Sequence, residues 1–137
     1  MHPARERYYR GLFLVATVYD GALGVIFTFF YKAAFDLLDI RSQLPNGGYV
    51  PLLGAFLLVM ATGYFLIYRH DLQRNRDLIV VGTLYKLAYS AIAFVFWAIG
   101  EVPHVVFAAL FGVADAVFFV LMLECLLFLR RMRTASS

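Results

Sequence analysis

The sequence has few of the residues on which soluble, disordered or thiol-rich proteins depend. Only 15% of its 137 residues are charged, against about 25% in an average soluble domain. The single cysteine, Cys125, excludes a disulfide scaffold and a thiolate metal site within this chain. Disordered chains are poor in Phe, Tyr, Leu and Val, whereas hydrophobic residues make up 63% here. These proportions indicate an integral membrane protein.

The signatures of cofactor sites are missing as well. A haem held between helices needs imidazoles within the hydrophobic segments, but His2 and His70 lie outside them and His104 lies at the outer mouth of the fourth. The sequence has one Glu-x-x-His spacing, from Glu101 to His104, rather than the two that a di-iron site needs, and it has no Cys-x-x-Cys and no glycine-rich phosphate loop. We therefore expect no cofactor and no metal, and we expect the lipid bilayer, rather than nucleic acid, to be the main partner.

Hydrophobic residues gather in four long runs, over residues 11–30, 49–68, 78–99 and 103–129. About 20 helical residues cross a hydrocarbon core of about 30 Å, so each run is long enough to span a membrane. Helices satisfy their own backbone groups in lipid, and the runs show no alternation of the barrel type. We predict an all-α integral membrane four-helix bundle with short loops, forming one transmembrane domain over residues 1–137.

The basic residues predict the orientation of these spans. Nine of the twelve basic residues lie before the first run, between the second and third runs, and after the fourth. In a four-span chain these three segments share one side of the membrane. Because cytoplasmic loops are rich in Lys and Arg, both termini are expected in the cytoplasm (N-in/C-in).

The connection after the first span has a helical pattern of its own. Lys32, Asp36, Asp39 and Gln43 recur at intervals of three or four residues, which places them on one stripe of a helix. This pattern predicts a short interfacial helix over residues 32–44, lying on the outer leaflet. In the alternative interpretation the first span continues past the membrane and bends.

Four charged residues fall inside the hydrophobic runs: Asp20, Lys86, Asp115 and Glu124. A charge at the bilayer centre costs at least ~2.5–3.5 kcal/mol, so each needs a partner, a polar cavity or neutralisation. Counted at 1.5 Å per residue from the basic ends, the first three reach the middle third of the membrane. Glu124 lies nearer the cytoplasm, where it is able to snorkel to the membrane surface or to meet an arginine.

An inward-facing cluster of Asp20, Lys86 and Asp115 is therefore predicted. Small residues lie one turn from each member, which favours close helix packing, and Tyr19, Tyr85 and Tyr89 are candidate partners at the site. Tyr64 and Ser90 are further polar side chains nearby. One base between two acids leaves one negative charge in excess, so a shared proton or cation is expected. The alternative is a purely structural fastener between helices.

The sequence also resembles a known kind of membrane protein. The positions that carry this resemblance are Tyr19-Asp20, Gly24, Gly54, Gly63-Tyr64, Gly82, Lys86, Pro103, Gly112, Asp115 and Phe118. In their order and topology they are similar to small bacterial four-helix membrane proteins of the DoxX-like kind. The resemblance implies a four-helix bundle in the bacterial inner membrane. It carries over no catalytic residue.

Three functional hypotheses follow from the polar cluster. In the first, the chain is a small transport or ligand-binding protein in which the cluster handles a proton, a cation or a polar ligand. In the second, it is a non-enzymatic accessory or assembly subunit of a larger membrane complex. The third is a membrane enzyme acting on a lipid or quinone, although Phe107, Phe111 and Phe118 favour packing or lipid contact over a quinone pocket. A homo-oligomer is compatible with the first two.

Overall fold

A computed structural model describes residues 3–39, 49–100 and 105–135, which are helical apart from short turns and contain no strand. The elements, in chain order, are α1 (Pro3–Phe29), α2 (Tyr31–Leu37), α3 (Tyr49–Arg69), α4 (Arg76–Ala98), α5 (Val105–Phe107), the π-helix η1 (Ala108–Ala114) and α6 (Asp115–Ala135). The all-α prediction is confirmed for the described residues. The connection over residues 101–104, which includes His104, lies outside them.

Four continuous helices are long and apolar enough to cross a membrane. They are α1, α3, α4 and the α5–η1–α6 segment, and each covers all or nearly all of one of the predicted hydrophobic runs. The first helix begins at Pro3, so the basic residues before the first run belong to a helix rather than to a polar tail. At 1.5 Å per residue, its 27 residues extend about 40 Å, beyond the ~30 Å of hydrocarbon.

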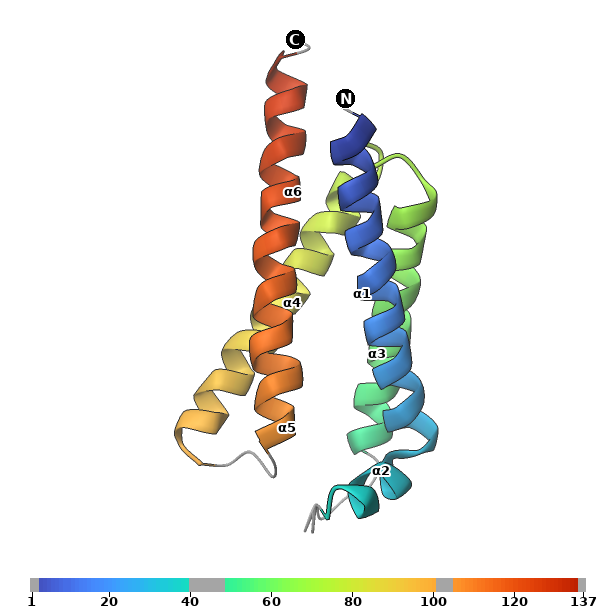
Figure 1. Cartoon of the computed structure of the whole chain (residues 1–137), viewed down its shortest axis with the longest axis vertical. Helices are drawn as coiled ribbons and strands as arrows, with labels where there is room; N and C mark the ends of the chain where they lie inside the picture. Colours follow the sequence, from blue (N-terminus) through green and yellow to red (C-terminus); the bar gives the residue numbers. More distant parts are fainter. Residues whose placement is uncertain (1–2, 40–48, 101–104, 136–137) are drawn as a thin grey trace.

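The helix after the first span is shorter than predicted. α2 ends at Leu37, and Asp39 follows in the left-handed region with φ 54°. Asp39 therefore does not continue the polar stripe that Lys32 and Asp36 begin, and this part of the prediction is wrong. Gln43 lies outside the described residues. A break at Phe30, with φ −124° and ψ 17°, separates α2 from α1, so the first span does not simply run on (Figure 1).

The fourth segment is not a regular α-helix. Residues 108–114 form a π-helix, in which hydrogen bonds run from i to i+5, immediately before Asp115. From α4, the Ser90 hydroxyl donates a hydrogen bond to the Gly112 carbonyl at 2.9 Å, and both groups are buried. The same carbonyl also accepts a hydrogen bond from the Asp115 backbone N–H, so the Ser90 hydroxyl uses its second acceptor position. π-Segments of this kind occur frequently at functional sites.

Close glycine contacts explain why α1 and α3 pack side by side along their length (Figure 1). A Cβ added at Gly54 would lie 2.5 Å from the backbone nitrogen of Thr28 and 2.8 Å from the carbonyl carbon of Phe27. A Cβ at Gly24 would lie 3.0 Å from the Gly54 carbonyl oxygen. Only glycine allows this approach, as in small-residue interfaces of membrane helices generally.

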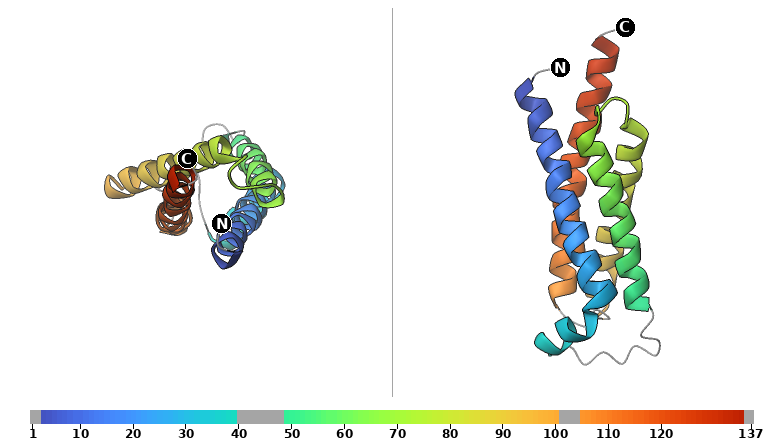
Figure 2. Two further views of the ribbon diagram at one scale, coloured as in Figure 1. Left: turned by 90° about the horizontal axis from the view of Figure 1, so that it is seen from above. Right: turned by 90° about the vertical axis from the view of Figure 1, so that its right-hand side faces the viewer.

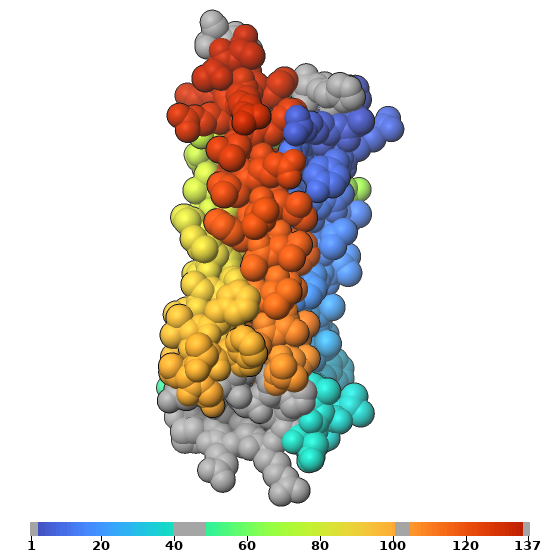
Figure 3. Space-filling model, turned by 60° about the vertical axis from the view of Figure 1, so that its left-hand side comes forward, coloured from blue at the N-terminus to red at the C-terminus, as the bar shows by residue number. Residues whose placement is uncertain are grey.

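The second pair of long helices is α4 and α6, and it packs against the first pair less closely toward one end. Figure 1 shows both termini and the α3–α4 connection at one end and α2 at the other, while α4 diverges from α3 toward the α2 end. Seen from above, α1 and α3 form one side and α4 runs away from them (Figure 2). Figure 3 shows α6 between α4 and α1 on one face. Residues 91–98 are consequently mostly exposed.

Candidate functional site

The centre of the structure is an ion cluster that joins three helices. The Lys86 ammonium on α4 donates one hydrogen bond to Asp20 Oδ1 on α1, at 2.8 Å, and another to Asp115 Oδ1 at the start of α6, at 3.0 Å. The three side chains are 0–1% exposed. The structure thus brings together the three charged residues for which the sequence predicts a common cluster, hereafter the Asp–Lys–Asp cluster.

Small residues beside the cluster let the helices approach. Gly82 lies one turn before Lys86, and a Cβ there would lie 2.6 Å from Cε1 of Tyr64. The Tyr64 hydroxyl donates a hydrogen bond of 2.9 Å to the Gly82 carbonyl. Ala16, one turn before Asp20, is fully buried. Because Gly82 has no side chain, the ring of Tyr64 lies against the backbone of α4, close to Lys86.

Aromatic rings surround the Lys86 ammonium. The distances from Nζ to the ring centroids are 4.8 Å for Phe118, 5.2 Å for Tyr19, 5.2 Å for Tyr85 and 5.7 Å for Tyr64. Each distance is within the ~6 Å over which a cation is attracted to a ring. These four rings, with the two aspartates, form what we call the ammonium cage. Arrangements of this type recognise ammonium groups.

Two of the three candidate tyrosines belong to this cage. The Tyr19 hydroxyl also donates to the Leu110 carbonyl at 2.6 Å, so Tyr19 links α1 to the π-helix. Tyr89 lies one layer further out, with its ring 4.5 Å from that of Tyr85 and 6.0 Å from that of Phe111. Tyr89, the third candidate partner, therefore contacts the rings of the cage rather than the charged groups.

Sequence reasoning did not select Tyr64 or Phe118 for the site. Phe118 follows Asp115 by three residues, a spacing that places both on one helix face, and this was the available signal. The same spacing also fits packing, because phenylalanine is common in apolar helices. Tyr64 lies on α3, which contributes no charge to the cluster, so no spacing within the sequence connects it to Lys86.

The cluster contains polar atoms whose hydrogen bonding is incomplete. Asp20 Oδ2, Asp115 Oδ2 and the Tyr85 hydroxyl are buried and have no hydrogen-bond partner among the described residues. The formal charges are two negative and one positive, which leaves one negative charge in excess. A buried charge without a partner is strongly unfavourable. The free oxygens mark where a proton or a cation would balance it.

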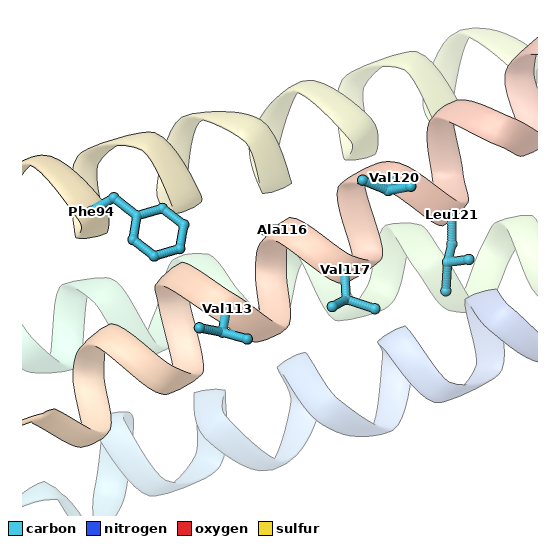
Figure 4. Close-up of a pocket in the computed structure, with 6 residues that line it drawn as sticks. All are labelled: Phe94, Val113, Ala116, Val117, Val120 and Leu121. Atoms are coloured by element: carbon cyan, nitrogen blue, oxygen red, sulfur yellow. The ribbon is translucent and has the colours of Figure 1, made fainter.

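An apolar groove adjoins the cage between α3 and α4. It has a volume of about 440 Å³ and is lined by Val59, Met60, Thr62, Gly63, Tyr64, Leu66, Ile67, Leu78, Val81 and Gly82. Tyr64 belongs both to this groove and to the cage, so its ring is the wall between them. A second hollow of about 360 Å³ lies between α4 and the η1–α6 segment. Phe94 faces it from α4 and only apolar side chains line it, so it offers a ligand no polar contact (Figure 4).

The fourth charged residue of the hydrophobic runs is separate from the cluster. Glu124 accepts a hydrogen bond from the Tyr9 hydroxyl at 3.0 Å and lies 3.8 Å from the Arg5 guanidinium, with about half of each charged side chain exposed. The expectation that Glu124 meets an arginine is confirmed. The adjacent Cys125 is fully buried.

Metal binding and known relatives give no further assignment. In residues 3–39, 49–100 and 105–135, no group of three or more His, Cys, Asp and Glu side chains is arranged to hold a metal ion. Comparison with known proteins found no matching family model, no matching curated protein and no matching solved structure. The residues of the cage and the charges they enclose are therefore the basis for a functional assignment.

Proposed function

We propose that this chain is a small multi-pass protein of the bacterial inner membrane whose Asp–Lys–Asp cluster binds and exchanges a proton or a monovalent cation during transport. The observation that carries the proposal is the excess of one acid, together with the two carboxylate oxygens that lack partners, Asp20 Oδ2 and Asp115 Oδ2. Ionisable residues within membrane spans mark substrate, ion and proton pathways in many transporters and pumps. The nine arginines at the end that holds both termini support cytoplasmic termini.

The cluster has the properties that exchange requires. It is buried in the middle of three helices, where low polarity strengthens the attraction for a balancing cation. Each aspartate uses one oxygen for Lys86 and keeps the other available. Binding a proton or cation at a free oxygen would neutralise the excess charge, and releasing it would restore the charge.

Proton flux into vesicles tests this proposal. The purified protein is reconstituted into liposomes that contain a pH-sensitive dye, and a potassium diffusion potential, negative inside, is imposed with valinomycin. We expect proton entry with the wild type and at least tenfold slower entry with Asp115→Asn, whereas the matched control Glu124→Gln keeps the wild-type rate. Equal rates in wild-type and Asp115→Asn vesicles, with both proteins eluting as one folded species in detergent, would overturn the proposal.

A second candidate is an accessory or assembly subunit of a larger membrane complex, or of a homo-oligomer. The observation in its favour is the mostly exposed second half of α4, over residues 91–98, where Ile92, Val95 and Trp97 are more than half exposed. In this case the cluster acts as a fastener between three helices. Asp115→Asn would then lower thermal stability or recovery of the complex in detergent, with no flux to lose.

A further inference from the structure

The α3–α4 groove opens on the outer surface of the bundle. Its lining includes Tyr64 and Ile67, which are 0–1% exposed, and Val59, Leu66 and Val81, which are 43–66% exposed. The groove therefore has a buried floor and an exposed rim. Because α3 and α4 are both long and apolar enough to cross a membrane, this opening would face the hydrocarbon chains of a bilayer.

The chemistry of the lining favours an apolar occupant. The two hydroxyl groups of the lining already donate hydrogen bonds, from Thr62 to the Leu58 carbonyl at 2.9 Å and from Tyr64 to the Gly82 carbonyl at 2.9 Å. The remaining side chains are aliphatic or, in Met60, a thioether. The volume of about 440 Å³ lies within the ~300–1,000 Å³ of ligand sites in proteins. A hydrocarbon chain matches this lining.

Arginines lie at the end of the groove that is nearer to the chain termini. Thr62, Leu66 and Arg69 follow one another at intervals of four and three residues, so Arg69 shares a helix face with two residues of the lining. Arg74 lies in the turn before α4, four residues before Leu78, which also lines the groove. The α3–α4 connection is at the same end as both termini (Figure 1). Positive charge thus borders an apolar groove.

These two arginines are available to an anion. Within the residues that the structure describes, neither Arg69 nor Arg74 forms an ion pair or a side-chain hydrogen bond. The Arg69 guanidinium lies 5.9 Å from the ring centroid of Phe65. Arg10, at the same end, is by contrast engaged, because it donates two hydrogen bonds to the Tyr68 carbonyl at 2.8 and 3.0 Å.

The charges of the connection match an anion with a single negative charge. Residues 69–77 contain three arginines and two aspartates, which leaves one positive charge in excess. Asp71 is engaged in its own turn, where Oδ1 accepts a hydrogen bond from the backbone N–H of Gln73 at 2.9 Å. A phosphodiester carries one negative charge, and guanidinium groups bind its oxygens in a favourable geometry. A zwitterionic head group would also bring a second cation to the arginines.

We infer that the α3–α4 groove binds one anionic phospholipid, with an acyl chain on the apolar lining and the phosphodiester at Arg69 and Arg74. Basic pockets between membrane helices bind anionic lipid head groups in this way. The inference rests on the membrane location in the proposed function. It does not rest on cation exchange, because neither arginine belongs to the Asp–Lys–Asp cluster.

Native mass spectrometry of the full-length protein tests this inference. The protein in dodecylmaltoside is titrated with phosphatidylglycerol or phosphatidylcholine that carry the same palmitoyl and oleoyl chains, and the apparent Kd of the first bound lipid is measured. We expect phosphatidylglycerol to bind about tenfold more tightly, because its phosphodiester gains charge-assisted hydrogen bonds without a competing cation. Equal affinity for the two lipids would overturn the inference.

A soluble phosphate ester separates the head group from the chains. Glycerol 3-phosphate carries the anionic group without an acyl chain, so we expect no saturable binding of it in the same titration. If glycerol 3-phosphate binds as tightly as phosphatidylglycerol, the site is a free-phosphate site and the groove has no part in it.

Two double variants test the head-group position. Arg69→Gln with Arg74→Gln removes the two proposed contacts, and Arg130→Gln with Arg131→Gln removes the same charge from α6, which does not line the groove. All four arginines are exposed, so neither double variant disturbs the core. We expect the preference for phosphatidylglycerol to disappear in the first double variant only. The same preference in both would overturn the assignment of the two arginines.

Two glycine variants test the position of the acyl chain. Gly63 lines the groove, and a Cβ there would lie 3.8 Å from Leu78, an ordinary contact, so Gly63→Leu fills part of the groove. Gly11→Leu is the matched control, because nothing lies within 4 Å of a Cβ at Gly11. We expect weaker phosphatidylglycerol binding for Gly63→Leu only. Equal binding by both variants would overturn the assignment of the groove.

The lipid measurement and the flux measurement are able to fail separately. If the protein shows no preference for phosphatidylglycerol while proton entry still depends on Asp115, the lipid inference is wrong and the proposed function stands. If the preference is present without proton entry, the lipid inference stands and cation exchange is wrong. If both signals are missing, both proposals are wrong.

Discussion

Replacing Lys86 with methionine removes the only base of the Asp–Lys–Asp cluster while keeping an unbranched side chain of similar length. The change leaves Asp20 and Asp115, each about 1% exposed, with no positive partner among the described residues. Breaking a buried pair by removing one partner costs about 3–5 kcal/mol, because the remaining charge is buried and uncompensated. Here one substitution strands two carboxylates, so we expect a loss of unfolding free energy at the upper end of that range.

Neutralising one of the two acids should lower the free energy of unfolding less than removing the base. Asp115→Asn keeps an oxygen that accepts from Lys86 and leaves a neutral Asp20–Lys86 pair, in which Lys86 Nζ still donates to Asp20 at 2.8 Å. A hydrogen bond to a charged group contributes about 1.5–3 kcal/mol, and the amide oxygen retains part of it. We therefore expect Asp115→Asn to cost less than about 2 kcal/mol. The excess acid makes the base the least replaceable member of the cluster.

Unfolding in mixed micelles provides the measurement. The helix signal in circular dichroism is followed as sodium dodecyl sulfate is added to protein in dodecylmaltoside, for wild type, Lys86→Met, Asp115→Asn and the double variant. The double variant retains a single carboxylate, so it should recover part of the stability that Lys86→Met loses. If Lys86→Met costs no more than Asp115→Asn, the charge reasoning given above is refuted.

Three further predictions concern packing and the rim of the bundle. Gly54→Ala should lower the free energy of unfolding by about 1–3 kcal/mol in the same assay, because the added Cβ would lie 2.5 Å from the backbone of α1. Gly21→Ala is the control and should cost far less, because the nearest atom to its Cβ is 3.8 Å away. Equal losses would contradict the close packing of α1 and α3. Ser90→Ala removes the buried hydrogen bond to the π-helix and should cost about 1 kcal/mol or more, while the exposed Thr62→Ala serves as its control and should stay near wild type. Glu124→Gln should change stability by less than about 1 kcal/mol, because its ion pair is half exposed; a larger loss would show that the rim contributes more than exposed pairs generally do.

Much of the fold was predictable because lipid imposes strict rules. A run of about 20 apolar residues must be helical to satisfy its backbone, and a charge within such a run must find a partner. These two rules were enough to predict four long helices and a meeting of Asp20, Lys86 and Asp115. Both rules need only the length of an apolar run and the position of a charge within it, and a sequence gives both.

The features that sequence reasoning missed depend on contacts between helices. The π-helix before Asp115 accepts a hydrogen bond from the Ser90 hydroxyl of α4. No local propensity within residues 108–114 predicts a π-helix there. Tyr64 reaches Lys86 only because Gly82 lets α3 approach α4. α2 ends shortly before Asp39, whose backbone is left-handed. Aspartate adopts this conformation more readily than most residues, but an aspartate in the sequence does not by itself predict it.

The unequal number of acids and bases separates the two main interpretations of the cluster. A fastener works best with matched charges and satisfied oxygens, because any unpaired buried group weakens the joint. One lysine and one aspartate would already join α1 to α4. The second aspartate adds a link to α6, but it also adds an excess negative charge and a second free oxygen to a buried site. An arrangement that sacrifices stability in this way favours a site that binds a cation over a purely structural joint.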